Sequence, residues 1–469
     1  MNLGYKISFQ KLIHHDLLIG EDNQELRRIA TKIHIELTQL SQPHHPLKII
    51  IAEREPVKFL ASFIAAHAAN CQVFLCNPDW GKQEWDQVFT LVKPDIILAT
   101  ETLPNFSHAQ FPIPYAPCPI PHSLIMIPTG GSSGQIKFAM HTWETLTASV
   151  QGFQEYFQLK QINSFCILPL YHVSGFMQFM RAVITGGKLV ILSFKSIELA
   201  PNYQINPQEF FISLVPTQLQ RLLQNQELTT WLAKFQTVLL GGAPAWEELL
   251  AKAKFHSIRL APTYGMTETA SQIVTLKPDD FLNGKISSGQ ILPHAQVKIR
   301  NNQGEVLPAN QIGNITIQAK SLSLGYYPNF WHDQDNFAVD DLGCLDEQGY
   351  LKIVGRDSDK IISGGENIYP IEIESAILQT QMVNDVCVIG VPDQDWGQAL
   401  TAIYVPQNSE ISTEDMKTAL KNQLSKFKIP KHWIPLETLP RNTQGKINRQ
   451  TLQIIATEFL RTHKVDEDL

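Results

Sequence analysis

The sequence lacks features that mark several common classes of protein. Its 469 residues carry a formal net charge of −7, so the basic excess typical of nucleic-acid-binding proteins is missing, and nucleic acid is not an expected partner. The six cysteines are scattered, without a Cys-x-x-Cys pair or a cluster of cysteine and histidine, which argues against zinc motifs. We therefore expect free thiols in a reducing, cytoplasmic compartment.

Targeting segments and long apolar runs are also missing. The first 16 residues contain no long apolar core and no cleavage-like site, so no secretory signal is expected. The most apolar long stretch, residues 59–76, is interrupted by His67, Asn70 and Gln72 and falls short of the roughly 20 residues that span a bilayer. We expect no integral membrane segment. Whether the chain forms a homo-oligomer is left open.

The sequence does contain an alternation of short apolar segments and amphipathic segments, which is typical of α/β domains with parallel sheets. The expected strands lie at residues 47–52, 71–76, 95–99, 124–127, 164–169, 188–192, 211–215, 237–240 and 260–263. The expected helices lie at residues 22–40, 57–70, 82–92, 143–157, 176–185, 218–224 and 246–254.

The pattern changes toward the C-terminus. From about Gly284, short strands separated by turns predict a β-rich, barrel-like subdomain that extends to residue 355. Beyond Arg356 the remaining chain has the size and mixed pattern of a small α+β domain, with helices expected at 371–379 and 413–424 and a basic tail. We therefore expect a large domain over residues 1–355 and a small domain over residues 356–469.

A glycine-rich stretch follows the strand expected at residues 124–127, which Pro128 is expected to end. Its candidate phosphate-binding residues are Thr129, Gly130, Gly131, Ser132, Ser133, Gly134 and Lys137. Glycines allow the backbone to approach a ligand closely, consecutive N–H groups can bind an anion, and lysine adds a point charge. The stretch indicates a polyphosphate site without the spacing of a Walker A loop, or else a flexible Gly/Ser turn.

Two further sites carry polar residues next to expected strands. Thr267 and Glu268 follow the strand that ends near residue 263, and a carboxylate there can hold Mg²⁺ together with phosphate oxygens. The alternative for Thr267 is a helix N-cap. Asp341 can accept both hydroxyls of a ribose, or it can be an ordinary turn residue. Arg356 can bind ribose or phosphate, or it can be a surface arginine.

Two C-terminal segments have weaker signals. The run IISGGENIYP at residues 361–370 is either a hairpin turn or backbone along which an elongated second ligand lies. The run PRNTQGKINR at residues 440–449 holds Lys446 beside a glycine. A lone lysine is normally exposed and inert.

Together, however, these motifs occur in a specific order. The series TGGSSGQIK, YGMTET, DDLG, GRDSDKIISGGENIYPIEIE and PRNTQGKINR resembles the adenylate-forming superfamily, which includes acyl-CoA synthetases, peptide-synthetase adenylation domains and firefly luciferase. The resemblance covers residues 124–452, and the first 120 residues match it only in their α/β pattern. It implies that a carboxylate attacks the α-phosphate of ATP, that pyrophosphate leaves, and that a thiol then displaces AMP from the acyl-adenylate.

The resemblance also implies roles for residues. The stretch from Thr129 to Lys137 would hold the β- and γ-phosphates, Thr267 the α-phosphate, and Glu268 the Mg²⁺. The remaining nucleotide contacts would come from Gly242, Tyr264, Asp341, Arg356 and, at the α-phosphate, Lys446. The small domain would then rotate about Ser358, and Ser363, Gly364 and Gly365 would line the pantetheine tunnel for CoA.

Five positions depart from the family pattern. Gln135 and Ile136 stand where a proline usually precedes the lysine, and Phe138 replaces the glycine that usually follows it. Asp340 replaces a glycine, and Ser358 replaces Asp or Lys at the hinge.

Three segments look like the subfamily of 2-succinylbenzoate–CoA ligases of menaquinone and phylloquinone synthesis. They are PLYHVSG at 169–175, LLGGAP at 239–244 and ASQIVT at 270–275. The resemblance implies an acyl pocket that includes His172, Gly241, Ser271 and Gln272, with a small carboxylic acid, ATP and CoA as ligands. His172 can instead be a structural histidine, and Gln272 a solvated helix residue.

Other functions stay open at this point. The chain can be another aryl- or acyl-CoA ligase, or an adenylation enzyme that loads a separate carrier protein. A non-catalytic nucleotide-binding regulator is a further alternative, although the presence of both Glu268 and Lys446 argues against it.

Overall fold

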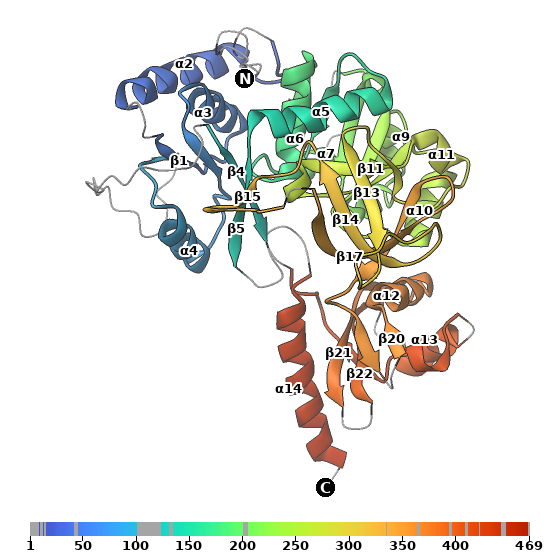
Figure 1. Ribbon diagram of the computed structural model, residues 1–469. Helices are drawn as coiled ribbons and strands as arrows, with labels where there is room; N and C mark the ends of the chain where they lie inside the picture. Colours follow the sequence, from blue (N-terminus) through green and yellow to red (C-terminus); the bar gives the residue numbers. More distant parts are fainter. Residues whose placement is uncertain are drawn as a thin grey trace. The chain divides into compact units, whose positions relative to one another are not determined.

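The computed structural model describes residues 9, 13, 16–41, 46–100, 123–130, 135–199, 205–333, 335–363, 366–393, 396–408, 411–421, 423–441 and 447–467. The chain divides into two compact units. The first comprises Met1–Gly242, His256–Val297 and Ile317–Phe337, and the second comprises Ala243–Phe255, Lys298–Thr316 and Ala338–Leu469. The fold is mixed α/β, as expected from the sequence (Figure 1).

One sheet of the first unit has the strand order β16-β15-β5-β4-β2-β1-β3. Its strands are β1 (Lys48–Ile51), β2 (Gln72–Leu75), β3 (Ile96–Leu98), β4 (Ile125–Gly130), β5 (Ile136–His141), β15 (Gly325–Tyr326) and β16 (Asn329–Phe330). Strand β1 pairs in parallel with β2 and β3, and β2 pairs in parallel with β4. Strands β4 and β5 form an antiparallel hairpin.

Helices cover both faces of this sheet. The helices α2 (Asn23–Leu40) and α3 (Pro56–Ala68) pack on one face, and α4 (Lys82–Val92) packs on the other (Figure 1). Side chains alternate between the faces along each strand. On β4, Ile125 and Ile127 join the cluster of α2 and α3, whereas Met126 joins the cluster that contains Trp85 of α4. Strands buried on both faces read as continuous apolar runs in the sequence.

The second sheet of the first unit has the order β12-β11-β10-β9-β8-β6-β7. Its strands are β6 (Asn163–Cys166), β7 (Leu189–Ile191), β8 (Phe210–Leu214), β9 (Thr237–Leu240), β10 (Leu260–Met266), β11 (Ser271–Thr275) and β12 (Gly289–Ile291). The helical elements are α5 (Trp143–Phe157), α6 (Val173–Thr185), α7 (Phe194–Leu199), α8 (Pro216–Leu222), α9 (Gln226–Leu232) and α11 (Pro278–Leu282), with short 3₁₀ turns η1 (Pro207–Glu209) and η2 (Thr267–Thr269). Strands β7, β6, β8, β9 and β10 are parallel, and β11 and β12 are antiparallel.

Helices α5 and α6 join the two sheets of the first unit into one core. Phe176 of α6 meets Phe63 of α3 edge to face at 4.8 Å between ring centroids. Helix α5 begins after Thr142, whose hydroxyl accepts from Thr145 N–H while the Thr145 hydroxyl accepts from Thr142 N–H. This reciprocal cap satisfies two N–H groups at the helix start and fixes where α5 follows β5.

The second unit contains short strands and the C-terminal helices. Strands β13 (Ala295–Arg300), β14 (Gly313–Ala319), β17 (Phe337–Leu345) and β18 (Tyr350–Arg356) are adjacent in that order. A further sheet contains β19 (Ile361–Ser363), β20 (Glu366–Ile368), β21 (Val383–Asp393), β22 (Gly397–Pro406) and β23 (His432–Pro435). The helical elements are α10 (Glu247–Phe255), α12 (Pro370–Gln379), α13 (Thr413–Leu420), η3 (Lys426–Lys428) and α14 (Arg449–Glu467).

Some expected boundaries were wrong. Strand β4 does not end at Pro128 but continues to Gly130. Strand β2 pairs with β4 only at Ile125 and Met126, and the carbonyl of Phe138, opposite Pro128, accepts from Tyr327 N–H instead. Neither neighbouring strand therefore needs the N–H that proline lacks.

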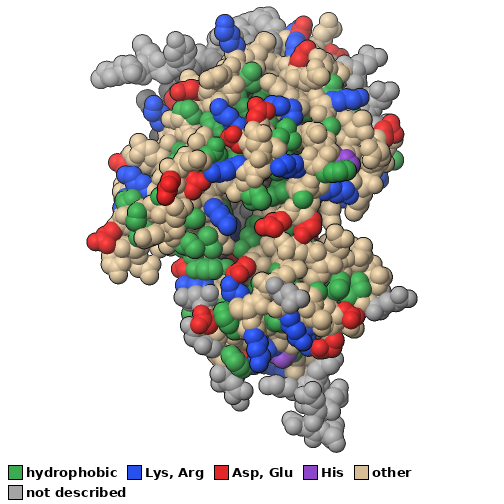
Figure 2. Space-filling view, turned by 90° about the vertical axis from the view of Figure 1, so that its right-hand side faces the viewer, with side chains coloured by type: hydrophobic (Ala, Val, Ile, Leu, Met, Phe, Trp, Pro, Cys, Tyr) green, Lys and Arg blue, Asp and Glu red, His purple; other side chains and the backbone are tan. Residues whose placement is uncertain are grey.

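The described residues contain no helix that is both long and apolar enough to cross a membrane. On the face shown in Figure 2, basic and acidic side chains are interspersed over the surface. That face therefore presents mixed charge.

Gly289, at the start of β12, lies very close to the backbone of β11. Its φ is +108°, and a Cβ there would lie 1.8 Å from the carbonyl carbon of Thr275 in the paired strand β11. Gly289→Ala should lower the free energy of unfolding by about 2–5 kcal/mol, because left-handed backbone costs about 1–2 kcal/mol and steric overlap about 1–3 kcal/mol. Chemical denaturation measures the change.

The matched control is Gly20→Ala. Gly20 has a similar φ of +83° but no atom within 4 Å of the added Cβ, so only the backbone cost applies, about 1–2 kcal/mol. Equal losses in the two variants would contradict close packing of β12 against β11.

Candidate functional site

The hairpin of β4 and β5 brings together both ends of the glycine-rich stretch. Thr129 is paired with Lys137, and Gly130 is paired with Ile136. Gly131, Ser132, Ser133 and Gly134 lie outside the described residues. The Lys137 Nζ lies 5.3 Å from the centroid of the Tyr326 ring, a distance typical of a cation–π contact.

The segment that follows β10 forms a tight turn. Strand β10 runs through Tyr264 to Met266, with an irregularity between Tyr264 and Gly265 where it pairs with β11. Thr267 opens the turn η2, so the N-cap position falls on Met266. Ala270 and Ser271 have φ values of +52° and +94°. Left-handed backbone at residues other than glycine is uncommon and often occurs at functional sites.

Glu268 is buried in this turn, with 7% of its surface exposed. The Tyr326 hydroxyl donates to Glu268 Oε1 at 2.6 Å, and Ser323 N–H donates to the Glu268 carbonyl at 2.7 Å. Burial raises the pKa of Tyr326, and the neighbouring Glu268 carboxylate raises it further. The tyrosine is therefore a stable hydrogen-bond donor at neutral pH.

His141, at the end of β5, holds the same turn from another side. Its Nε2 lies 2.8 Å from the Thr267 carbonyl oxygen, and its Nδ1 lies 3.1 Å from the Thr145 hydroxyl. A carbonyl only accepts, so Nε2 carries the proton. Burial lowers the pKa of His141 to about 4, which keeps the ring neutral.

Arg181 of α6 is a buried cation beside the start of β11. Only 3% of its surface is exposed. Its Nη2 donates to Ser271 Oγ at 3.0 Å and to Gln272 Oε1 at 2.7 Å, and its guanidinium carbon lies 4.4 Å from the centroid of the Phe153 ring. Burial lowers the pKa of Arg181 to about 10. An anion placed here would stabilise the charged form.

Two polar groups in this cluster are buried without a hydrogen-bond partner in the part of the chain that the structure describes. Among the described residues, neither Arg181 Nε nor Gln272 Nε2 has a hydrogen-bond partner, although both are buried. Gln272 lies on β11 with 7% of its surface exposed, so its interpretation as a solvated helix residue was wrong. Buried donors without acceptors cost free energy, which a carboxylate could recover.

The other residues expected at the acyl pocket lie at ends of neighbouring elements. His172 is the residue before α6, and its ring lies 4.6 Å from that of Tyr171. Gly241 and Gly242 follow β9, which is parallel to β10. A Cβ at Gly241 would lie 2.5 Å from Thr263 Oγ1. The carboxyl ends of parallel strands are the usual ligand-binding edge of such sheets.

In the second unit, the structure brings Asp341 and Arg356 together. They are paired residues of β17 and β18, and the Arg356 Nε lies 3.4 Å from Asp341 Oδ1. Asp340 binds the expected hinge residue, because Ser358 N–H donates to Asp340 Oδ1 at 3.1 Å and the Ser358 hydroxyl donates to Asp340 Oδ2. Two of the departures from the family pattern are thus hydrogen-bonded to each other.

The run at residues 361–370 forms a β19–β20 hairpin in which Ser363 is paired with Glu366, as its hairpin interpretation predicted. Gly364 and Gly365 lie outside the described residues.

Lys446 also lies outside the described residues, but the segments on either side of it are anchored. Arg441 and Ile447 form an isolated antiparallel bridge. Arg449 donates to the Val388 carbonyl at 2.8 Å, and it forms ion pairs with Glu374 at 3.0 Å and Asp359 at 3.3 Å.

Sequence reasoning missed three side chains at the site in the first unit. Arg181 had a detectable signal, since it is the single charged residue in the helix Val173–Thr185. His141 is four residues beyond Lys137 on one strand and therefore shares its face. Tyr326 becomes a neighbour of Glu268 only through tertiary structure.

The donor set fits Mg²⁺ bound jointly with a polyphosphate. Among the described residues, no group of three His, Cys, Asp or Glu side chains could hold a metal by itself. Mg²⁺ commonly uses one or two carboxylates plus substrate phosphates. The Glu268 carboxylate, with one oxygen bound by Tyr326, fits that pattern.

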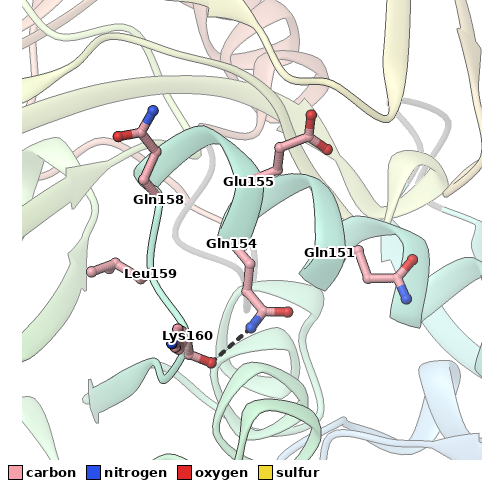
Figure 3. A pocket seen from close by; sticks show the side chains of 6 residues that line it. All are labelled: Gln151, Gln154, Glu155, Gln158, Leu159 and Lys160. Atoms are coloured by element: carbon pink, nitrogen blue, oxygen red, sulfur yellow. Dashed lines mark hydrogen bonds between the residues drawn. The ribbon is translucent and has the colours of Figure 1, made fainter.

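A surface pocket of about 470 Å³ lies elsewhere, at the end of α5 (Figure 3). It is lined by Gln151, Gln154, Glu155, Gln158, Leu159 and Lys160. The Gln154 side chain donates to the Lys160 carbonyl at 2.9 Å. None of the residues expected to act in the reaction lines this pocket, so the candidate site is placed at the η2 turn.

Comparison with known proteins identifies the family of the chain. Residues 45–327 match the family model "AMP-binding enzyme", and residues 372–446 match "AMP-binding enzyme C-terminal domain". The chain is 35% identical over 338 residues to a 2-succinylbenzoate–CoA ligase of Oceanobacillus iheyensis, covering 70% of this chain and 68% of that protein. It is 36% identical over 331 residues to the ligase of the same name from Listeria monocytogenes, covering 69% and 68%.

Solved structures give the same result. The o-succinylbenzoate CoA synthetase (MenE) of Bacillus subtilis, in complex with the acyl-adenylate intermediate OSB-AMP, has a TM-score of 0.79 at 26% identity and covers 93% of this chain and 95% of that one. The same protein in complex with ATP and a magnesium ion has a TM-score of 0.78 at 25% identity, covering 94% and 96%. The chain belongs to the AMP-binding enzyme family.

Proposed function

We propose that this chain is an AMP-forming acid–thiol ligase that converts 2-succinylbenzoate, ATP and CoA into 2-succinylbenzoyl-CoA, AMP and diphosphate. One carboxylate of the acid attacks the α-phosphorus of ATP, and diphosphate leaves. The CoA thiol then attacks the acyl carbon, and AMP leaves with the bonding electron pair. The product would serve menaquinone or phylloquinone biosynthesis.

The contacts of Arg181 with Ser271 and Gln272 are the observation that supports 2-succinylbenzoate as the acid. A buried cation without a counter-charge among the described residues, bound by Ser271 and Gln272, suits a substrate with a second carboxylate. Arginine binds carboxylates in planar, paired hydrogen bonds. The relatives named 2-succinylbenzoate–CoA ligases act on an acid with two carboxylates, which supports this choice.

We assign roles to the other residues by the same proposal. Thr129 to Lys137 hold the outer phosphates, Thr267 the α-phosphate, and Lys446 the charge that develops there. Glu268 holds Mg²⁺, which neutralises phosphate charge when it is bound. Asp341 and Arg356 bind the ribose, Gly242 and Tyr264 complete the nucleotide site, and His172 and Gly241 border the acid.

We further propose a large domain over residues 1–355 and a small one over 356–469, with a hinge at Ser358 and with Ser363, Gly364 and Gly365 facing CoA. The working compartment would be the cytoplasm, and nucleic acid would not be a partner. Whether a homo-oligomer forms can be measured by sedimentation.

The proposed function is tested by ATP–diphosphate exchange with a panel of carboxylic acids. We expect 2-succinylbenzoate to support the fastest exchange, because it alone in a panel with benzoate, coumarate and fatty acids carries a second carboxylate for Arg181. Faster exchange with any other acid of the panel would show that the substrate assignment is wrong.

Arg181→Met should lower kcat/KM for 2-succinylbenzoate about 10–100-fold, since a hydrogen bond to a charged group contributes about 1.5–3 kcal/mol and 1.4 kcal/mol is about tenfold. Two analogues that each lack one carboxylate identify the group involved. The analogue that lacks the carboxylate bound by Arg181 should be turned over equally by both proteins.

Arg221→Met is the matched control. Arg221 pairs with Glu198 on the surface, so this variant should behave as the parent protein. A loss in Arg181→Met that is the same for the diacid and for the analogue that is still turned over would contradict carboxylate binding.

Lys446→Ala should slow adenylate formation about 10²–10³-fold, because it removes a cation from the charge that develops at the α-phosphate. Thioester formation from supplied acyl-adenylate should be unchanged. Rapid-quench measurement of each half-reaction tests this. Lys417→Ala, which removes a half-buried lysine paired with Glu414, is the control, and equal loss in both half-reactions would contradict the assigned role.

A further inference from the structure

Three side chains of the first unit project from one face of its β5-containing sheet. Lys137 and His141 are four residues apart on β5, so they share a face. Tyr326 of β15 is paired with Ala139, which lies midway between them. Paired residues of neighbouring strands point to the same side, so Tyr326 stands between Lys137 and His141.

The η2 turn packs against this row of side chains. Tyr326 donates to Glu268 Oε1 at 2.6 Å, and His141 donates to the Thr267 carbonyl at 2.8 Å. The Tyr326 ring also lies under Lys137 Nζ at 5.3 Å. Tyr326 therefore contacts both the lysine of the glycine-rich hairpin and the carboxylate of the turn.

We infer that Tyr326 is a positioning residue for adenylation: its hydroxyl orients the Glu268 carboxylate for the Mg²⁺ that accompanies ATP, while His141 holds the backbone of the same turn. The inference rests on the proposed function, since it requires that ATP bind here with a metal ion. Hydrogen bonds to a metal-binding carboxylate fix its orientation, and losing one commonly reduces metal affinity or activity 10–100-fold.

Nothing else in the described contacts of Glu268 fixes its carboxylate. The Ser323 N–H binds the backbone carbonyl of Glu268 rather than its side chain. In the part of the chain that the structure describes, Glu268 forms no ion pair. Removing the Tyr326 hydroxyl should thus leave the carboxylate free to rotate while the backbone of the turn stays in place.

The test compares Tyr326→Phe with the parent protein. Phenylalanine keeps the ring below Lys137 and beside Trp331, which lies edge to face with Tyr326 at 5.5 Å, and it removes only the hydroxyl. We expect the Kd for MgATP, measured by calorimetry, to rise about 10–100-fold. The Kd for ATP in EDTA should change less than about twofold, on the same argument.

Neighbouring variants separate positioning from folding. Tyr327→Phe is the matched control, because the Tyr327 ring packs edge to face on Phe74 in an apolar cluster, and it should bind MgATP as the parent protein does. His141→Gln keeps a side-chain N–H donor and should retain more MgATP affinity than His141→Leu. Thioester formation from supplied acyl-adenylate should be unchanged in Tyr326→Phe, since no diphosphate is present in that step.

Two results would overturn the inference. One is a Tyr326→Phe protein that binds MgATP as tightly as the parent protein. The other is an equal loss with and without the metal ion, which would indicate a structural role only. Failure of the proposed function looks different, because it would appear in the parent protein itself, either as no binding of MgATP or as faster diphosphate exchange with another acid.

Discussion

Two side chains of opposite charge, Glu268 and Arg181, are buried in the first unit and are bound by neutral groups. Among the described residues, neither forms an ion pair. Tyr326 donates to the carboxylate, and the guanidinium donates to Ser271 and Gln272. Burying a charge costs several kcal/mol unless it is compensated. Each buried charge therefore favours the binding of a ligand of opposite charge, a cation at Glu268 and an anion at Arg181.

A short backbone segment connects Glu268 to Ser271, which Arg181 contacts. The turn η2 passes directly into β11, so Glu268 and Ser271 are three residues apart, with left-handed backbone at Ala270 and Ser271. The Ser149 hydroxyl donates to the Ala270 carbonyl at 2.7 Å, and His141 holds Thr267. Strand β5 and helix α5 thus hold one short segment, which carries the Glu268 carboxylate and leads into Ser271 and Gln272, the partners of Arg181.

Periodicity predicted many buried strands of the first unit, because strands buried on both faces are continuous apolar runs, but it missed β5, α7, α9 and α11. The expected helices at 82–92 and 143–157 coincide with α4 and α5. Helix α14 was not predicted, and its segment was expected only as a basic tail, because its polar composition weakens the helical pattern. Motif order located the Thr267–Glu268 turn, whereas Tyr326 was unpredictable because 58 residues separate it from Glu268. Of the two interpretations of Gln272, the solvated helix residue was wrong, because Gln272 is buried on strand β11.

An isotope experiment tests directly whether a carboxylate of the acid attacks the α-phosphorus of ATP. 2-Succinylbenzoate labelled with ¹⁸O in both carboxylates is incubated with the protein, MgATP and CoA, and the products are analysed by mass spectrometry. If an acyl-adenylate forms and the thiol displaces AMP, one ¹⁸O atom passes from the acid to the phosphate of AMP. Label in ADP or inorganic phosphate, or AMP without label, would contradict attack of the carboxylate on the α-phosphorus.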